Sequence, residues 1–191
     1  MTIAVYAASS TKVKQEYIDS SYLLGKMIAE HNHTLIYGAG AVGLMGAVAS
    51  GVLDNKGQVI GVIPQFMVDQ GWQNDRCTEL IVTRDMHERK AYIAEHADAM
   101  IALPGGIGTL EELTEILTWK QLGLHTKPIV IFNIQGYYDT LLTFFRQMID
   151  ENMIRDIHLN MFRVAHRAEE VLTAINECPK WDSSIRKIAQ I

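Results

Sequence analysis

The sequence has few cysteines, no long hydrophobic run and no excess of positive charge. Its 191 residues include only two cysteines, Cys77 and Cys178, which form no C-x-x-C motif and have no histidines at zinc-finger spacing. We therefore expect a reduced, cytoplasmic protein without disulfides or a metal site. The first residues, MTIAVYAASS, lack the pattern of a signal peptide, and no stretch approaches the roughly 18 apolar residues of a membrane span. Secretion and membrane insertion are not expected.

Basic residues are outnumbered by acidic ones. Seventeen Lys and Arg against 22 Asp and Glu give a formal net charge of -5 with no basic stripe. Proteins that bind nucleic acids hold the phosphate backbone with clustered cations, so a nucleic acid is not expected as the main partner. Hydrophobic residues make up 48% of the chain, enough for one full-sized core. We expect a single nucleotide-binding domain over residues 1–191, in which 179–191 form a C-terminal tail.

Short apolar runs alternate with longer segments that have helical spacing of apolar residues. Because these runs are almost continuously apolar, both faces of their sheet should be covered. This predicts an α/β fold, a Rossmann-like, doubly wound and mostly parallel sheet with helices on both faces, whose ligands bind beyond the carboxyl ends of the strands. Further helices are expected near 137–152 and 168–177. The expected strands are Ile3–Ala7, Leu35–Tyr37, Val59–Ile63, Leu80–Val82, Ala99–Leu103 and Ile129–Phe132.

Glycine is locally abundant, since seven of the 14 glycines lie in two short segments. One of them, LPGGIGTLEEL, places Gly105, Gly106 and Gly108 between an expected strand and an expected helix. The backbone N–H groups of such a loop and of the helix N-terminus can hold a phosphate. Tight packing of a helix against a sheet is an equally good reason for these glycines. Thr109 and Glu112 also have capping-box spacing, which would occupy both side chains.

The other glycine segment, YGAGAVGLMGAVA, contains Gly38, Gly40, Gly43 and Gly46 and has G-x-G-x-x-G spacing. That spacing is typical of dinucleotide-binding folds, which also place an acidic residue at the end of the next strand to bind the ribose. The next expected strand ends at Pro64 without an acidic residue. The sequence therefore favours a mononucleotide site over an NAD site.

The segment DMHERK, residues 85–90, opens an expected helix and carries two adjacent cations, Arg89 and Lys90. On a helical wheel both flank the apolar stripe that includes Met86 and Ile93, whereas Glu88 points away. Together with a phosphate loop, they would form an anion clamp, a role to which the planar guanidinium is suited. The alternative is that both stems lie along the core with their charges in water.

Taken together, PGGIGTLEE, DMHERK and GAGAVGLMG make this chain resemble the LOG-type family of cytokinin riboside 5'-monophosphate phosphoribohydrolases, formerly labelled lysine decarboxylases. The resemblance implies hydrolysis of the N-glycosidic bond of adenosine 5'-monophosphates, including N6-modified ones, to free base and ribose 5-phosphate. It also implies no cofactor, a homodimer, and Arg89 and Glu112 as the catalytic pair. The substrate-binding positions that it implies are Ser9, Ser10, Gly40, Gly43, Met86, Lys90, Gly105, Gly106, Ile107, Gly108, Thr109, Leu110, Glu111 and Thr118.

The sequence departs from the family pattern at three positions. Ala8 and Ala39 stand where the family often has glycine, and Gly71 stands where many relatives place a substrate-contacting glutamate, so the preferred base stays open. Two other functions are also considered. One is a carrier that binds a nucleotide or a molybdopterin-type cofactor without hydrolysis. The other is a pyridoxal-phosphate decarboxylase, which needs a buried Schiff-base lysine, for which Lys90 is the only candidate near the loops.

Overall fold

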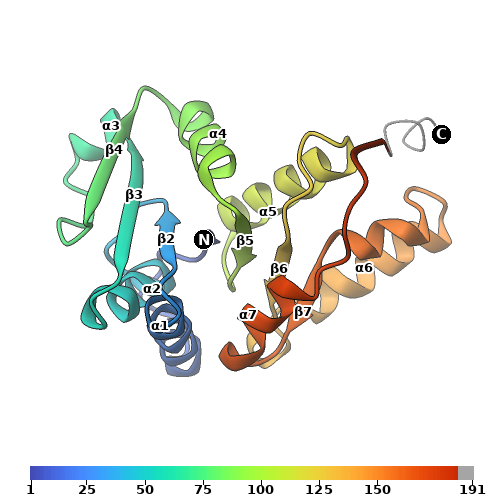
Figure 1. Ribbon diagram of the computed structural model, residues 1–191, viewed down its shortest axis with the longest axis horizontal. Helices are drawn as coiled ribbons and strands as arrows, with labels where there is room; N and C mark the ends of the chain where they lie inside the picture. The colour runs from blue at the N-terminus through green and yellow to red at the C-terminus, as the bar shows by residue number, and fades with distance from the viewer. Residues whose placement is uncertain (185–191) are drawn as a thin grey trace.

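The structure, a computed structural model, describes residues 1–184, which form one seven-stranded parallel sheet flanked by helices (Figure 1). Along the sheet the strands follow the order β4-β3-β2-β1-β5-β6-β7, and every neighbouring pair is parallel. This confirms the predicted fold class and every predicted strand. The strands are β1 (Thr2–Tyr6), β2 (Thr34–Tyr37), β3 (Gln58–Pro64), β4 (Glu79–Thr83), β5 (Ala99–Ala102), β6 (Ile129–Phe132) and β7 (Arg163–Ala165).

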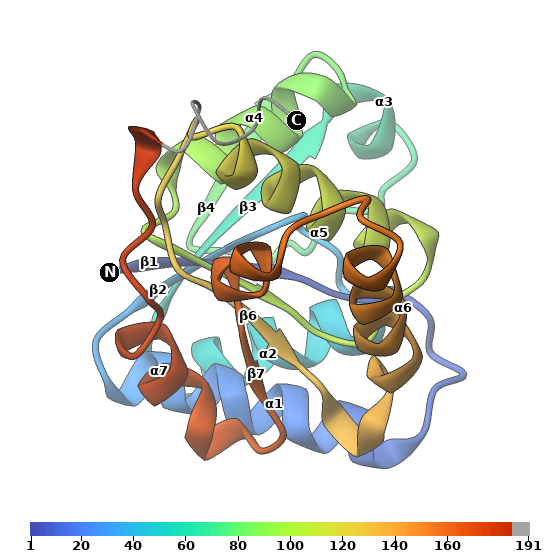
Figure 2. The same cartoon turned by 90° about the vertical axis from the view of Figure 1, so that its right-hand side faces the viewer.

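Helices cover both faces of the sheet, as Figure 2 shows with α1, α2 and α7 below it and α4 and α5 above it. No helix among residues 1–184 is long and apolar enough to cross a membrane. The α-helices are α1 (Gln15–Glu30), α2 (Gly43–Asp54), α3 (Gln65–Val68), α4 (Met86–His96), α5 (Ile107–Gln121), α6 (Asp139–Asp150) and α7 (Ala168–Asn176), and short 3-10 helices form η1 (Ile134–Gly136) and η2 (Asp156–Met161).

Alternation along the strands divides the apolar residues between two cores. On β1, Ile3 and Val5 pack with α1, α2 and α7, whereas Ala4 and Tyr6 face α4 and α5. Both sets are buried because helices lie on both sides, which is why the strands read as continuous apolar runs.

The central strand β1 lies where the chain changes direction across the sheet. From β1 the chain proceeds through β2, β3 and β4 on one side and then crosses to β5 on the other. Backbone hydrogen bonds join the loops at this point, because Ala8 donates to the Pro104 carbonyl and Met45 donates to the Ala8 carbonyl, each at 3.1 Å. The crevice beyond such a switch point is where doubly wound folds bind ligands.

The N-terminus of α5 and the C-terminal tail differ from what the sequence predicts or extend beyond the described residues. Helix α5 begins at Ile107 with Gly106 as its N-cap, so Thr109 lies inside the first turn and the predicted capping box with Glu112 does not form. In the tail, Trp181 is buried and donates through its indole N–H to the Lys120 carbonyl at 2.8 Å. Residues 185–191 of the predicted tail lie outside the described residues.

Candidate active site

The two glycine-rich loops meet beside the loop that follows β1. Gly43 has a φ of +64°, and a Cβ there would lie 2.6 Å from the Ser9 carbonyl carbon and 2.7 Å from the Ser10 carbonyl oxygen. Gly43 therefore allows the serine loop to approach α2. Ser9 and Ser10 are exposed beside it, and the Ser10 hydroxyl accepts a bond from the Lys12 N–H at 3.2 Å.

Gly40 is involved in packing within the first glycine loop. Its carbonyl accepts a bond from the Tyr37 hydroxyl at 3.2 Å, and a Cβ on it would lie 3.0 Å from the Met45 sulfur. It also forms an isolated antiparallel bridge with Gln73. The bridge ties this loop to the segment between α3 and β4.

The second glycine loop presents an open surface. A Cβ on Gly106 or Gly108 would meet no atom of the described residues within 4 Å, and Ile107 between them is 84% exposed. Among residues 1–184, no side chain caps the N-terminus of α5. The N–H groups of a first helical turn have no partners within the helix and attract anions. Gly105 differs, because a Cβ there would lie 2.1 Å from the hydroxyl of the buried Thr109.

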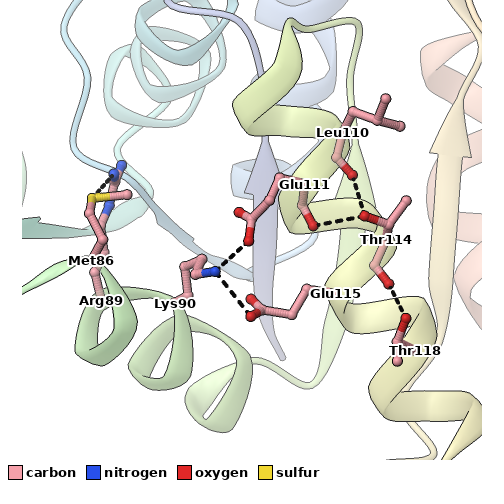
Figure 3. Close-up of polar contacts among 8 residues, drawn as sticks. All are labelled: Met86, Arg89, Lys90, Leu110, Glu111, Thr114, Glu115 and Thr118. Atoms are coloured by element: carbon pink, nitrogen blue, oxygen red, sulfur yellow. Dashed lines mark hydrogen bonds and ion pairs between the residues drawn. The ribbon is translucent and has the colours of Figure 1, made fainter.

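Arg89 is a buried cation held by main-chain oxygens. Its Nε donates to the Val62 carbonyl at 3.1 Å and its Nη2 to the Gly38 carbonyl at 2.8 Å. Its Nη1 contacts the Met86 sulfur at 3.5 Å, a weak acceptor (Figure 3). Burial lowers the pKa of Arg89, and the charges of Glu112 and Tyr6 oppose that shift.

Arg89 also explains one of the glycines. A Cβ on Gly38 would lie 1.7 Å from the Arg89 Nη2 atom, so only glycine leaves room for the guanidinium. The spacing in the sequence places Gly38 in a segment typical of nucleotide-binding loops, and in the structure its missing side chain makes room for Arg89.

Glu112 lies about one turn into α5 and is partly buried. Burial raises the pKa of its carboxyl to about 7, while the charge of Arg89 opposes the rise. Within residues 1–184 the carboxylate has no hydrogen-bond partner. Such a group is available for a ligand, and its ionisation falls in the range that general acid–base chemistry uses.

Lys90 is bridged by two carboxylates. Its Nζ lies 2.5 Å from Glu111 Oε1 and 3.0 Å from Glu115 Oε1, as Figure 3 shows. Burial opposes its charge, but the hydrogen bonds to Glu111 and Glu115 outweigh burial and raise its pKa. Both cations of the predicted anion clamp lean inward as expected, and both already have protein partners.

Thr118 lies apart from Lys90 and its two carboxylate partners. Its hydroxyl donates to the Thr114 carbonyl at 2.8 Å, and the Thr114 hydroxyl donates to the Leu110 carbonyl at 2.9 Å. Figure 3 shows Thr114 and Thr118 on the side of α5 turned away from Lys90. Thr118 is six residues beyond Glu112, about 9 Å along the helix axis. The structure of one chain therefore does not bring Leu110 and Thr118 together with Arg89 and Glu112.

A second buried lysine was missed by the sequence reasoning. Lys120 is fully buried, and burial lowers its pKa to about 8. Its Nζ donates to the Lys127 carbonyl at 2.8 Å. It lies about 20 Å along α5 from Ile107, at the opposite end of the helix from the glycine loop. Lys90 is held by two carboxylates and Lys120 lies at the far end of α5, so neither is an unpaired lysine beside the second glycine loop. No group of residues within 1–184 has the composition of a metal site.

Comparisons with known proteins agree with this arrangement of motifs. A family model described as "Possible lysine decarboxylase" matches residues 45–175. The chain is 40% identical to "Cytokinin riboside 5'-monophosphate phosphoribohydrolase LOG2" of Arabidopsis thaliana, over 97% of this chain and 88% of that protein. It is 41% identical to the Arabidopsis thaliana protein named LOG3 in the same series, over 92% and 81% of the two chains. The chain belongs to the LOG family.

Solved structures show the same fold at lower sequence identity. The molybdenum cofactor carrier protein from Chlamydomonas reinhardtii superposes with a TM-score of 0.71 at 22% identity, over 93% of this chain and 96% of that one. The molybdenum cofactor binding protein from Rippkaea orientalis gives a TM-score of 0.69 at 24% identity, over 92% and 94%. These likenesses establish the fold of this LOG-family chain and nothing about its ligand.

Tyr6 is a further buried residue near Arg89 and Glu112 that the sequence reasoning missed. It ends β1, is 4% exposed, and its side chain faces α4 and α5. Burial and the charges of Glu112 and Glu115 raise the pKa of its hydroxyl, whereas Arg89 lowers it. The signal in the sequence was a single hydroxyl at the end of an apolar run, immediately before the serine loop.

Proposed function

We propose that this protein hydrolyses the N-glycosidic bond of adenosine 5'-monophosphates, including N6-modified ones, and releases the free base and ribose 5-phosphate. The observation that carries the proposal is the open, uncapped N-terminus of α5 at Gly106 and Gly108, about one turn from the partly buried Glu112. A phosphate held at the first feature places the ribose of the same molecule near the second. The names of the 40%-identical relatives support this activity.

Glu112 suits the chemistry of the proposed reaction. Cleavage of a ribosyl C–N bond builds positive charge on the sugar, as in glycosidases, and a carboxylate near the anomeric carbon stabilises that charge and activates water. With a pKa of about 7, Glu112 is substantially ionised at neutral pH and basic enough to accept a proton from water. We therefore assign it as the catalytic carboxylate.

Arg89 is proposed as its catalytic partner. The bonds to Val62 and Gly38 fix the guanidinium, and among residues 1–184 Nη1 has only the weak Met86 sulfur as a partner. That nitrogen can orient the nucleotide and stabilise negative charge on the departing base. The glycine loop meanwhile holds the 5'-phosphate, so binding far from the reacting atoms positions the scissile bond.

The proposal is tested by incubating the protein with AMP and with N6-prenyl-AMP and separating the products by chromatography. Free base and ribose 5-phosphate in equal amounts are the expected products. Unchanged nucleotide with both substrates would contradict the assignment. The same panel, extended to other nucleoside monophosphates, ranks the bases, which the glycine at position 71 leaves open.

The two other functions make different predictions in simple experiments. A carrier would bind nucleotide without turnover and would have no need for an ionisable group of pKa about 7 beside Arg89. A pyridoxal-phosphate enzyme would show the absorbance of a bound aldimine after incubation with the cofactor. Neither behaviour is expected here.

We further propose a homodimer that acts in the cytoplasm. On α6, Leu141, Leu142 and Met148 pack against the core of their own chain, but Phe144 is 49% exposed and is available to a second copy. Cys77 and Cys178 are free thiols, in keeping with a reducing compartment. Light scattering should give twice the chain mass, and a monomeric mass would contradict the dimer.

A further inference from the structure

Three consecutive carbonyl groups at the start of the second glycine loop are bound from outside the loop. The Tyr138 hydroxyl donates to the Leu103 carbonyl at 2.6 Å, and the Ala8 N–H donates to the Pro104 carbonyl at 3.1 Å. The Tyr137 hydroxyl donates to the Gly105 carbonyl at 2.6 Å. All three carbonyls therefore have fixed directions.

A fixed carbonyl also fixes the direction of the N–H group of the next residue, which applies to Pro104 and Gly105 but not to Leu103, because proline follows it. In a trans peptide the C=O and the N–H of the next residue point in opposite directions. The bond from Tyr137 to the Gly105 carbonyl therefore turns the Gly106 N–H away from Tyr137. In the same way, the bond from the Ala8 N–H to the Pro104 carbonyl turns the Gly105 N–H away from Ala8. Flexible glycines on their own would not hold these peptide planes.

The two tyrosines are themselves held by the turn after β6. Asn133 is fully buried, and its Oδ1 accepts the Tyr138 N–H at 2.7 Å while its Nδ2 donates to Asp139 Oδ1 at 2.6 Å. Gln135 and Gly136 have φ values of +54° and +72°, so two successive left-handed residues shape the turn. The turn is therefore anchored before it reaches the glycine loop.

Aromatic contacts complete the support of Tyr137. Its ring packs edge-on against Tyr17 of α1, with centroids 5.9 Å apart, and against Tyr138, with centroids 5.0 Å apart. Tyr137 is nevertheless 44% exposed, so water could satisfy its hydroxyl. Burial alone therefore does not explain why this hydroxyl bonds to a loop carbonyl.

We propose that Tyr137 is a positioning residue that orients the backbone N–H group of Gly106 toward the phosphate of a phosphomonoester ligand. The inference rests on the proposed function, because it takes the loop to be the phosphate site. The tyrosines do not touch the ligand. Tyr137 acts through the Gly105 carbonyl, on a loop whose Gly106 and Gly108 face open space. Tyr138 supports it by holding the Leu103 carbonyl and by packing edge-on against the Tyr137 ring.

The test compares Tyr137→Phe with Tyr22→Phe as the matched control. The control removes a hydroxyl that bonds to Asp54 at 3.3 Å between α1 and α2. Affinities for ribose 5-phosphate, AMP and adenosine are measured by calorimetry, and KM and kcat with AMP by adenine release. Loss of one hydrogen bond that orients the loop should lower the affinities for ribose 5-phosphate and AMP about three- to tenfold. Adenosine affinity and kcat should stay within twofold, and Tyr22→Phe should change none of these values.

An unchanged ratio of AMP to adenosine affinity in Tyr137→Phe would overturn the proposal. This outcome includes an equal loss of affinity for both ligands, which would indicate a general structural defect. Failure of the proposed function looks different, since the wild-type protein would then bind AMP without releasing adenine. The affinity ratios would still decide the role of Tyr137 in that case.

Discussion

The two glycine-rich loops look alike in the sequence and differ in what their missing side chains make room for. In the first loop, a Cβ on Gly38 would collide with Arg89 and one on Gly43 with the serine loop. In the second, Gly106 and Gly108 face open space at an uncapped helix N-terminus. The first loop thus uses glycine to admit other parts of the protein, and the second uses it to leave the backbone accessible to a ligand.

The substitution Gly38→Ala should have the largest effect, because the position of Gly38 has no room for a side chain. The new Cβ would lie 1.7 Å from the Arg89 Nη2 atom and must displace the guanidinium from the Gly38 carbonyl. We expect a loss of about 2–3 kcal/mol in the free energy of unfolding. Adenine release should fall at least about 100-fold. Urea unfolding and turnover measure the two effects, and wild-type values for both would contradict this role of Gly38.

The pH dependence of kcat tests whether Glu112 acts as the carboxylate beside these loops. Because its pKa is raised to about 7, kcat under saturating AMP should rise about tenfold per pH unit below pH 7 and level off above it. A profile that falls as pH rises through 7 would indicate instead that the protonated acid is the active form.

The same pKa has a consequence for stability. The folded protein holds a proton on Glu112 between its ordinary pKa of 4.5 and about 7, whereas the unfolded chain does not. This residue therefore lowers the free energy of unfolding as pH rises through that window. At pH 8, Glu112→Gln should unfold at a higher urea concentration than the wild type, with a gain of about 1–3 kcal/mol. A less stable variant at pH 8 would contradict the raised pKa.

Gly106→Ala should have a smaller effect, confined to the ligand. The φ of Gly106 is -85°, which any residue adopts, and within residues 1–184 the added methyl group meets no atom closer than 4 Å. The free energy of unfolding should stay within about 0.5 kcal/mol, while KM for AMP should rise about three- to tenfold because the methyl group intrudes on the phosphate site. A clear loss of stability with normal KM would reverse the contrast between the two loops.

Lys120→Met should leave turnover unchanged, because Lys120 lies at the far end of α5. Burial lowers its pKa to about 8, so between pH 8 and its ordinary value of 10.5 the unfolded chain binds more protons than the folded protein. Wild-type stability therefore rises with pH in that window, and the variant should lose this slope. At pH 7 the variant should be more stable by about 1–2 kcal/mol. Thermal unfolding across this pH range provides the measurement.

The fold was predictable because its signal is local. Runs such as Ile3–Ala7 and Ile129–Phe132 are apolar at every position, and this pattern alone indicates strands covered on both faces. The inward lean of Arg89 and Lys90 also followed from helical periodicity, and both are largely buried.

The contacts that distinguish the loops were not predictable, because they join residues far apart in the chain. Arg89 bonds to Gly38 across 51 positions, and Tyr137 bonds to Gly105 across 32. The capping box expected for Thr109 was wrong for a related reason. Helix α5 starts two residues before it, and Thr109 packs against Gly105.

The most direct test of the central claim is adenine release from AMP by Glu112→Gln under single-turnover conditions, with AMP affinity measured on the same sample. The second glycine loop and Arg89 are intact in this variant, so AMP should bind within about threefold of wild type. The rate of adenine release should fall at least about 1,000-fold, because the group that stabilises the ribosyl cation and activates water is gone. Release at the wild-type rate would contradict the assignment of Glu112 as the catalytic carboxylate.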